Sequence, residues 1–412
     1  MEESGAGSRR AQCKSGAPGL ACGGGPRHDT GMSAILPPVP RRRPAALLAL
    51  RLFVLVLLPG ALLAPRPAAA VQAVVVARGL DQPWALAFLP DGRMLVTERP
   101  GRIRPVAEDG TVGAPLRGLP PVDATGQCGL LDLVTDPAHA TNRLLYWTYA
   151  EAGEGGNTVA VARGRLEGDA LVDVQVIFRQ QPRVASRLHC GSRLAFARDG
   201  RLHVGLGDRF GRRADAQDPA NHLGKTVRIE SDGRVPADNP HVGRAGARPE
   251  LWSLGHRNIQ GMAVHPVTGD LWQSEHGPQG GDEINLIERG RNYGWPLVTF
   301  GREYVLGTRI GEEGPRAGFE QPLKVWLPTS IGPSGMAFVT GNRYPGWQGS
   351  LLVGALRGQA LHRLSIEGRR VTGEERLLVD PGARIRDVRQ GPDGWIYLLT
   401  DGSGGQLLRL LP

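Results

Sequence analysis

The chain has 412 residues, enough for one large domain or two ordinary ones, and its 59 glycines and 33 prolines contrast with only 5% aromatic residues. This composition favours a β-rich architecture with many turns over a helical bundle. The formal net charge is +9, but residues 1–70 carry nine basic and three acidic side chains, which leaves 40 basic and 37 acidic residues in the rest of the chain. This near balance argues against a nucleic-acid-binding protein.

The first 70 residues have the pattern of a secretory leader. The stretch RRRPAALLALRLFVLVLLPGALLAPRPAAA (41–70) contains a basic segment, an apolar run that is too short to span a bilayer, and small residues at its end. We therefore expect an N-terminal extension with a cleavable signal peptide over residues 1–70, with Met32 as an alternative start. The mature domain would cover residues 71–412 and be periplasmic or secreted, without stable membrane insertion.

Six segments of the mature chain share one pattern: a short apolar strand, a tight turn of the Asp-Gly type and a second strand. Alternating apolar side chains bury one face of such a hairpin, and the glycine permits the turn. The segments are WALAFLPDGRMLVTER (84–99), GLLDLVTDPAHATNRLLYWTYA (129–150), SRLAFARDGRLHVGLGD (192–208), GMAVHPVTGDLWQSEHG (261–277), SGMAFVTGNRYPGWQGSLLVGAL (334–356) and IRDVRQGPDGWIYLLTDG (385–402).

The repeats predict the fold class. One hairpin cannot bury its apolar face alone, but neighbouring units stacked around an axis can. Six strand-rich units of uneven spacing fit a six-bladed β-propeller better than a sandwich, whose strands follow at shorter and more regular intervals. We therefore predict an all-β fold, a six-bladed β-propeller over residues 71–412. The loops that join blades surround one mouth of the central channel in such a fold, and we expect a functional site there.

Polar side chains recur just before the first strand of several repeats, so in a propeller they could face one pocket at the channel mouth. A lone histidine is more often structural than catalytic, and His189 is open to three interpretations: a metal ligand, a packed core residue or a proton acceptor. Two arginines on one strand face could simply be solvated, but at a pocket they suit a polyanion, since guanidinium groups pair with carboxylates. The recurring residues are Gln127, His189, Arg257, Asn258, Arg384 and Arg386.

The stretch WQSEHGPQGGDEINLIERGRNYGWP (272–296) has the composition of a cation-binding loop. Gly277-Pro278 and Gly280-Gly281 form a loop with freely presented backbone carbonyls, and Asp282 and Glu283 follow. Carbonyl and carboxylate oxygens are the ligands that a hard cation such as calcium prefers. The spacing of an EF-hand is absent, so any site would be assembled from loop oxygens. An ordinary acidic turn explains the composition equally well.

Taken together, these motifs resemble the soluble quinoprotein, or PQQ-dependent, aldose sugar dehydrogenases of the glucose/sorbosone dehydrogenase group. The resemblance implies a six-bladed propeller that holds pyrroloquinoline quinone (PQQ) and calcium at its mouth. It also implies the oxidation of aldose sugars at the anomeric carbon to lactones. The resemblance runs from about Leu80 to Leu410 and is carried by QPWALAFLPDGRMLVTER, GQCGLLDL, LGHRNIQGMAVHP, SEHGPQGGDEINLIERGRNYGWP and IRDVRQGPDG.

The resemblance implies a role for each matching residue. The catalytic group would consist of His189 as the general base, Arg257 as the cation that stabilises developing negative charge on the quinone oxygen, and Gln127 beside them. Expected contacts to the quinone are Gln127, Arg257, Asn258, Arg357, Arg384 and Arg386, with Thr329 or Ser330 as a hydroxyl contact. Expected calcium ligands are the backbone carbonyls of Gly277 and Pro278, with a second site at Glu283 and Tyr293.

The chemistry of sugar oxidation agrees with this interpretation. The reaction removes a proton from a hydroxyl and a hydride from carbon, and no side chain accepts hydride. No Gly-x-Gly-x-x-Gly motif follows a strand and opens a helix, which argues against a nicotinamide site. No Cys-x-x-Cys-His motif for haem attachment occurs, so the electrons would leave to an external acceptor.

Two other functions remain open on the sequence. One is a calcium-dependent propeller lactonase or esterase, and the other is a non-catalytic secreted propeller that binds glycans or proteins. The first would account for the cation-binding loop and a histidine, but it needs no cluster of arginines. The chain also lacks long insertions of the kind found in dimeric members of the resembled family, so we expect a monomer.

Only two cysteines, Cys128 and Cys190, lie outside the leader. Members of the resembled family usually carry glycine at the first position and often an aromatic residue at the second. The two cysteines flank Gln127 and His189 at equivalent points of adjacent blades, in a compartment where disulfides form. We therefore expect a Cys128–Cys190 disulfide, with two small buried thiols as the alternative.

Overall fold

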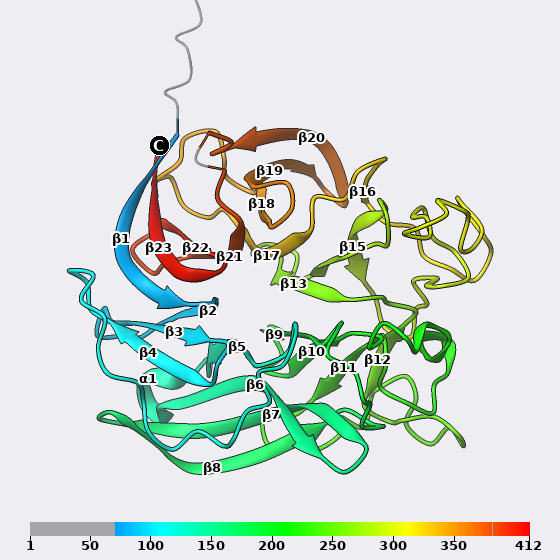
Figure 1. The fold of residues 1–412 in the computed structure, drawn as a ribbon, viewed down its shortest axis with the longest axis horizontal. Coiled ribbons are helices and arrows are strands. Elements are labelled where there is room, and N and C mark those ends of the chain that lie inside the picture. Colours follow the sequence, from blue (N-terminus) through cyan, green and yellow to red (C-terminus); the bar gives the residue numbers. More distant parts are fainter. Residues whose placement is uncertain (1–70, 381) are drawn as a thin grey trace, which may run out of the picture. The chain divides into compact units, whose positions relative to one another are not determined.

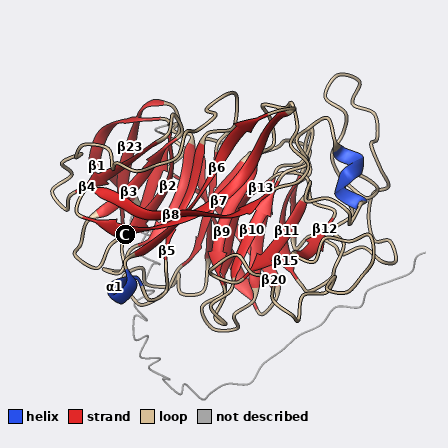
Figure 2. Cartoon of the chain, turned by 90° about the horizontal axis from the view of Figure 1, so that it is seen from below, coloured by secondary structure: helices blue, strands red, loops and turns tan. Residues whose placement is uncertain are grey.

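The computed structural model describes residues 71–380 and 382–412, and the signal peptide predicted within residues 1–70 lies outside them. Six antiparallel sheets surround a common axis and form a six-bladed β-propeller (Figure 1). Strands dominate the side view as well, and the described residues contain only one short α-helix, α1 (His139–Asn142), and a 3₁₀ turn at Arg213–Gln217 (Figure 2). The predicted all-β class and the six-bladed propeller are thus confirmed.

Five blades have four strands and one has three. In five blades the innermost strand comes first in the sequence and the following strands add outward; in the sixth, β21, β22 and β23 add outward and β1, from the start of the described chain, is outermost. The blades are β2 (Pro83–Phe88), β3 (Met94–Glu98), β4 (Arg102–Val106); β5 (Leu130–Thr135), β6 (Leu144–Gly153), β7 (Gly156–Glu167), β8 (Ala170–Arg179); β9 (Gly191–Phe196), β10 (Leu202–Leu206), β11 (Lys225–Ile229), β12 (Leu251–Leu254); β13 (Ile259–Val264), β14 (Leu271–Glu275), β15 (Asp282–Ile287), β16 (Lys324–Trp326); β17 (Pro333–Phe338), β18 (Leu351–Ala355), β19 (Ala360–Glu367), β20 (Arg370–Leu377); and β21 (Ile385–Gln390), β22 (Ile396–Thr400), β23 (Ser403–Leu411), β1 (Gln72–Asp81).

The sixth blade closes the ring, because it contains strands from both ends of the described chain. The first strand, β1, pairs antiparallel with the last, β23, in a register that runs from Gln72 opposite Leu411 to Asp81 opposite Ser403. The edge of the last sheet is therefore covered by the start of the domain, which joins the two ends without a covalent bond. Figure 1 shows the blue and red strands side by side in this blade.

The six inner strands coincide with the six repeats found in the sequence. They are nearly fully buried, and adjacent inner strands approach closely around the axis. Two glycines permit this approach: a Cβ at Gly261 would lie 2.3 Å from the carbonyl oxygen of Ser334, and one at Gly335 would lie 1.9 Å from a carboxylate oxygen of Asp387. The inner ring is thus held close enough for loops from all six blades to meet at one mouth.

A network of four charges, three buried and one partly buried, joins inner strands across the channel. Arg193 on β9 contacts Asp132 on β5 at 3.1 Å and Asp387 on β21 at 2.9 Å, and Arg389 contacts the same two carboxylates at 2.7 and 2.9 Å. The Arg193 guanidinium also packs 4.1 Å from the ring centroid of Trp84 on β2. Every charge in the network has partners of opposite sign, as burial requires. The network thereby ties four blades together.

No helix among residues 71–380 and 382–412 is long and apolar enough to cross a membrane.

Candidate active site

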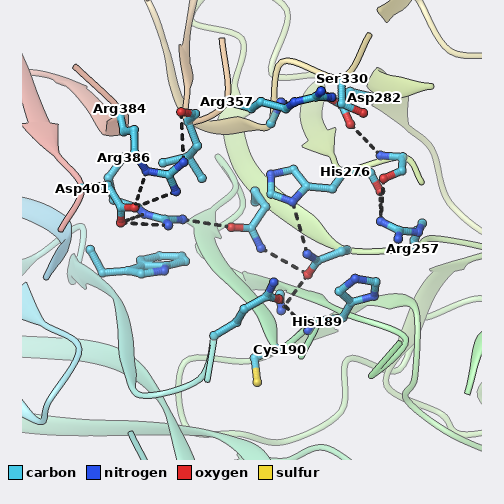
Figure 3. Close-up of a pocket in the computed structure, with 18 of the residues that line it drawn as sticks. His189, Cys190, Arg257, His276, Asp282, Ser330, Arg357, Arg384, Arg386 and Asp401 are labelled. Carbon is cyan, nitrogen blue, oxygen red and sulfur yellow. Dashed lines mark hydrogen bonds and ion pairs between the residues drawn. The ribbon is translucent and has the colours of Figure 1, made fainter. Parts of the chain in front are cut away.

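One cavity of about 750 Å³ lies at the channel mouth, where residues from all six blades or from their preceding loops converge (Figure 3). Ten of the thirteen residues predicted from the sequence line it, so the recurring polar positions do share one pocket. Thr329, Glu283 and Tyr293 do not line it, whereas Ser330, the neighbour of Thr329, does. The ten are Gln127, His189, Arg257, Asn258, Gly277, Pro278, Ser330, Arg357, Arg384 and Arg386.

His189 lies on the loop before β9, and its ring is held from the side opposite the cavity. Its Nδ1 is 2.6 Å from Oδ1 of the buried Asp208, whose Oδ2 accepts a hydrogen bond of 2.8 Å from the indole N–H of Trp295. The edge of the Phe210 ring packs against the imidazole, with 5.2 Å between ring centroids. In the described part of the chain Nε2 has no hydrogen-bond partner. The geometry leaves this nitrogen to face the cavity.

Burial and the nearby positive charge of Arg257 favour the neutral form of the His189 ring. Burial lowers the pKa of His189 below its ordinary value of 6.5, against the opposing effect of the Asp208 hydrogen bond, and the positive charge of Arg257 acts in the same direction as burial. Burial alone would raise the pKa of Asp208, but its hydrogen bond to His189 and the nearby positive charges lower it. An ionised Asp208 accepts hydrogen bonds only, so Nδ1 carries the proton and Nε2 is free to accept one.

Arg257 spans the cavity wall between the loop before β13 and the loop after β14. Its guanidinium donates to the carbonyl oxygens of His276 at 2.9 Å and Gly277 at 2.7 Å, and to the hydroxyl of Tyr304 at 2.8 Å. The remaining nitrogen, Nε, is buried and has no partner in the described structure. A buried donor without a partner is costly, and because Nε is not exposed to the cavity, it does not by itself mark a ligand contact.

Asn258 links the two sides of the cavity floor. Its Oδ1 accepts from the backbone N–H of Gly191 and from Nε2 of Gln260, both at 3.2 Å. Because Gly191 follows the histidine loop directly, Asn258 connects the blade that carries Arg257 with the blade that carries His189.

The opposite wall is strongly cationic. Arg384 and Arg386 on the last blade both donate to Asp401, Arg384 to Oδ2 at 2.8 and 3.0 Å and Arg386 to Oδ1 at 3.0 and 3.1 Å. The whole cavity is lined by five guanidinium groups and two carboxylates, which leaves a formal charge of +3; they are Arg99, Arg257, Arg357, Arg384, Arg386, Asp282 and Asp401. Such a lining favours a ligand with several negative charges.

The Gly-rich loop brings several oxygens to one edge of the cavity. The carbonyls of Gly277 and Pro278 lie there together with the buried carboxylate of Asp282, which accepts from the backbone N–H of Gly277 at 2.9 Å and of Gly332 at 2.8 Å. The hydroxyl of Ser330 donates to the Pro278 carbonyl at 3.1 Å. Burial raises the pKa of Asp282, so a nearby cation would stabilise its ionised form.

Comparison with known proteins agrees with this arrangement. The family model described as glucose / sorbosone dehydrogenase matches residues 80–409. The chain belongs to the glucose/sorbosone dehydrogenase family. It is 45% identical to the aldose sugar dehydrogenase YliI of Escherichia coli K12 over 350 residues, which cover 84% of this chain and 94% of that protein.

Two solved structures share both fold and sequence with this family member. The apo-form of the soluble aldose sugar dehydrogenase of Escherichia coli is similar with a TM-score of 0.81 and 44% identity, over 83% of this chain and 100% of that one. The PQQ-bound form of the aldose sugar dehydrogenase of Streptomyces coelicolor is similar with a TM-score of 0.68 and 29% identity, over 84% and 99%.

In this dehydrogenase-family propeller, Glu283 and Tyr293 lie beside a second, much smaller cavity rather than at the mouth. Burial and the negative charge of Glu275 raise the pKa of Glu283 well above its ordinary range. The Tyr293 hydroxyl is already engaged, since it donates to the carbonyl of Leu286 at 2.5 Å and accepts from the N–H of Glu288 at 2.8 Å. In the described residues no group of three or more His, Cys, Asp or Glu side chains is arranged to hold a metal ion, so any cation site here depends on backbone oxygens.

Several site residues of this family member were missed from the sequence, among them Asp401 in the cavity lining and Asp208, the partner of His189. Asp208 follows the second strand of its repeat by two residues, in VGLGD, and Asp401 follows the second strand of the last repeat directly, in LLTDG. This shared position, a carboxylate just after a buried second strand, is a signal that could have found both. His276 and Tyr304 gave no such signal, because only the fold brings their loops to the cavity.

The expected disulfide is present in the structure. Cys128 and Cys190 are bonded, with their Cα atoms 5.7 Å apart, and both are almost completely buried.

Proposed function

We propose that this protein oxidises aldose sugars at the anomeric carbon to lactones, with PQQ as the hydride acceptor, calcium beside it and an external acceptor for the electrons. The observation that carries the proposal is one cavity with a carboxylate-held histidine on one wall and a cationic lining on the other. The first suits removal of a hydroxyl proton, and the second suits an anionic cofactor. Family membership supports the sugar as substrate.

His189 is the proposed general base. With Nδ1–H held by Asp208, the lone pair of Nε2 faces the cavity and can take the proton of a sugar hydroxyl. The positive charge that forms on the imidazole is then stabilised by the carboxylate 2.6 Å away. Gln127 lies beside this base, because its Oε1 accepts from the backbone N–H of His189 at 2.9 Å.

The residues at the other wall fit PQQ, which supplies an electrophilic quinone carbon that accepts hydride when it is bound. A formal charge of +3 on the cavity lining matches the three carboxylates of the cofactor. Arg384, Arg386 and Arg357 are the proposed carboxylate partners. Arg257 and Asn258, which both line the cavity, are the proposed partners of the quinone oxygens, with Gln127 and either Thr329 or Ser330 as further contacts. Ser330 is the one of that pair that lines the cavity.

Calcium is proposed at the carbonyls of Gly277 and Pro278, where it would act as a Lewis acid toward a quinone oxygen. Both carbonyls line the cavity, and each has a second lone pair beyond the hydrogen bond that it already accepts. A second ion is proposed at Glu283 and Tyr293. The raised pKa of Glu283 supports this, since a buried carboxylate next to another is stabilised by a cation.

The proposal is tested on purified protein freed of metal and cofactor. PQQ and calcium are added together and singly, and glucose-dependent dye reduction is followed, with the sugar product analysed as lactone. Activity that needs both additions supports the proposal. Hydrolysis of a lactone substrate without PQQ would instead indicate a lactonase, and a folded protein without either activity would indicate a binding module.

A matched variant, His189→Gln, isolates the base. We expect it to lose turnover while PQQ binding survives, since the side chain lies away from the arginine wall. Loss of both on this substitution would contradict the assignment.

We also propose that residues 1–70 form an extension with a cleavable signal peptide and that residues 71–412 form the mature, exported propeller, which acts as a monomer in the periplasm or outside the cell. N-terminal sequencing of the protein from the exported fraction and its mass in solution test these points.

A further inference from the structure

The loop that carries His189 is joined to its neighbour by three links within a few residues. The backbone N–H of Gln127 donates to the carbonyl of Arg187 at 2.8 Å, and the side-chain Oε1 of Gln127 accepts from the N–H of His189 at 2.9 Å. The third link is the Cys128–Cys190 disulfide, which follows each of these partners by one residue. One loop precedes β5 and the other precedes β9, so all three links join adjacent blades.

The backbone of His189 needs such support. Its φ is 50°, in the left-handed region that non-glycine residues rarely adopt and that persists only where the surroundings impose it. The two loops also pack without spare room, since a Cβ at Gly126 would lie 2.4 Å from the carbonyl oxygen of Arg187. The residue in this left-handed turn carries the ring whose Nδ1 lies 2.6 Å from Asp208, and Figure 3 shows His189 among the residues that line the cavity.

Hydrogen bonds hold both sides of this turn: Oε1 of Gln127 accepts from the N–H of His189 at 2.9 Å before it, and Oδ1 of Asn258 accepts from the N–H of Gly191 at 3.2 Å after it. The covalent bond at Cys190 adds a link between these two points, and it joins the turn to the segment before β5. That segment is itself anchored, since the N–H of Leu130 donates to the carbonyl of Arg99 at 3.0 Å. The disulfide is therefore placed where it acts on the orientation of the ring.

A buried arginine, Arg209, contacts the disulfide from the side of Cys128. The Arg209 guanidinium approaches Sγ of Cys128 to 3.9 Å, donates to the Ser186 carbonyl at 2.7 Å and contacts Oδ1 of Asn157. Arg209 directly follows Asp208, the partner of His189. The disulfide thus packs between the base on one side and the segment that carries its carboxylate on the other.

We propose that Cys128 and Cys190 are positioning residues for the reaction: their disulfide holds His189 in the left-handed turn that keeps Nδ1 on Asp208 and Nε2 toward the substrate. This inference rests on the proposed role of His189 as the base. Cys190 lines the cavity next to His189, so we expect loss of the disulfide to affect proton removal more strongly than binding at the arginine wall.

The test removes the bond with the double substitution Cys128→Ala/Cys190→Ala, which leaves no lone thiol. We expect kcat to fall about 10- to 100-fold, the order of loss that accompanies an ångström-scale displacement of a catalytic group. The Kd for PQQ, measured by fluorescence quenching, and the KM for glucose should change little. A stability effect alone would lower the yield of folded protein without this split between kcat and the binding constants.

A second measurement does not depend on activity. In cofactor-free protein labelled with ¹⁵N-histidine, the Nδ1–H proton of His189 should resonate far downfield because of its short bond to Asp208, and His189→Gln assigns it. The resonance should broaden or shift in the double variant. If the wild type shows the resonance but no sugar oxidation, the proposed function fails and the positioning role of the disulfide is still measured.

The matched control is Thr148→Val, which removes a hydrogen bond between the same two blades and leaves the disulfide in place. Thr148 Oγ1 donates to the carbonyl of Ser192 at 2.8 Å and accepts from the N–H of Asp132 at 2.9 Å. We expect kcat and the His189 resonance to stay unchanged. If the double variant does not fold, folded wild-type protein reduced with a phosphine gives the same comparison. An unchanged kcat and resonance without the disulfide, or an equal loss in Thr148→Val, would overturn the proposal.

Discussion

The pair formed by His189 and Asp208 makes the sharpest prediction, through the substitution Asp208→Asn. The carboxylate now accepts the Nδ1 proton at 2.6 Å and is buried, with Trp295 and the N–H of Phe210 holding its two oxygens at 2.8 Å. Asparagine keeps the shape but offers an amide that can donate to Nδ1. That donation favours the imidazole tautomer with its proton on Nε2, which cannot act as a base.

The expected loss in kcat is roughly 10²- to 10⁴-fold, the range for a misdirected or missing general base, which corresponds to about 3–5 kcal/mol in the barrier. The pH profile adds a second readout. The base must be neutral, so activity falls as pH drops through the pKa of His189, which burial holds below 6.5. The Asp208 carboxylate opposes this shift, so its loss lowers the pKa further and moves the acid limb to lower pH.

The assay is steady-state dye reduction with saturating PQQ, calcium and glucose between pH 4.5 and 8 in about half-unit steps. Asp270→Asn makes the same chemical change at an exposed pair with Arg369, 2.8 Å apart and remote from the cavity, and should leave kcat unchanged. A wild-type kcat in Asp208→Asn, or an acid limb that moves to higher pH, would refute the reasoning.

Three further predictions concern the cofactor, the cation and the channel. Arg386→Met should weaken PQQ binding by about 10- to 150-fold, the equivalent of one charge-assisted hydrogen bond, as measured by fluorescence titration; unchanged affinity would remove Arg386 from the site. Treatment with EGTA should abolish dye reduction, and calcium should restore it; full activity in metal-free protein would contradict the calcium proposal. Arg193→Leu should lower the free energy of unfolding by about 3–5 kcal/mol in urea, because Asp132 and Asp387 lose one of their buried partners; a loss below about 1 kcal/mol would show that Arg389 alone satisfies them.

The fold could be predicted because its unit is local. Each repeat carries an apolar strand, a turn and a second strand within about 20 residues, so the pattern is visible in a short window and its sixfold recurrence gives the blade number. The closure of the ring could not be predicted in the same way. It depends on β1 pairing with β23, and these strands are separated by nearly the whole domain.

For the site too, features within a local repeat could be predicted, and contacts made by the three-dimensional fold could not. The polar residues before the inner strands were found because they recur at one position of a local repeat, and the structure brings ten of the thirteen predicted residues to one cavity. The partners of these residues are the part that was missed. Asp208 lies just after the second strand of the blade whose first strand follows His189, and Tyr304 reaches Arg257 from a loop 47 residues away. Such pairings follow from how strands and loops pack in three dimensions, which no short window contains.

Asp401 affects how the cationic wall works, because a carboxylate between two arginines opposes the binding of an anion. Without it, Arg384 and Arg386 would lie two residues apart with uncompensated like charges, and Arg386 would be buried in that state. Asp401 gives one oxygen to each, which fixes both guanidinium groups in place before any ligand arrives. Five guanidinium groups still outnumber two carboxylates in the cavity, so attraction for a polyanion remains. The carboxylate therefore lowers the intrinsic charge of the wall but removes the cost of ordering its two long side chains on binding, and for a rigid ligand this preorganisation favours selectivity over raw attraction.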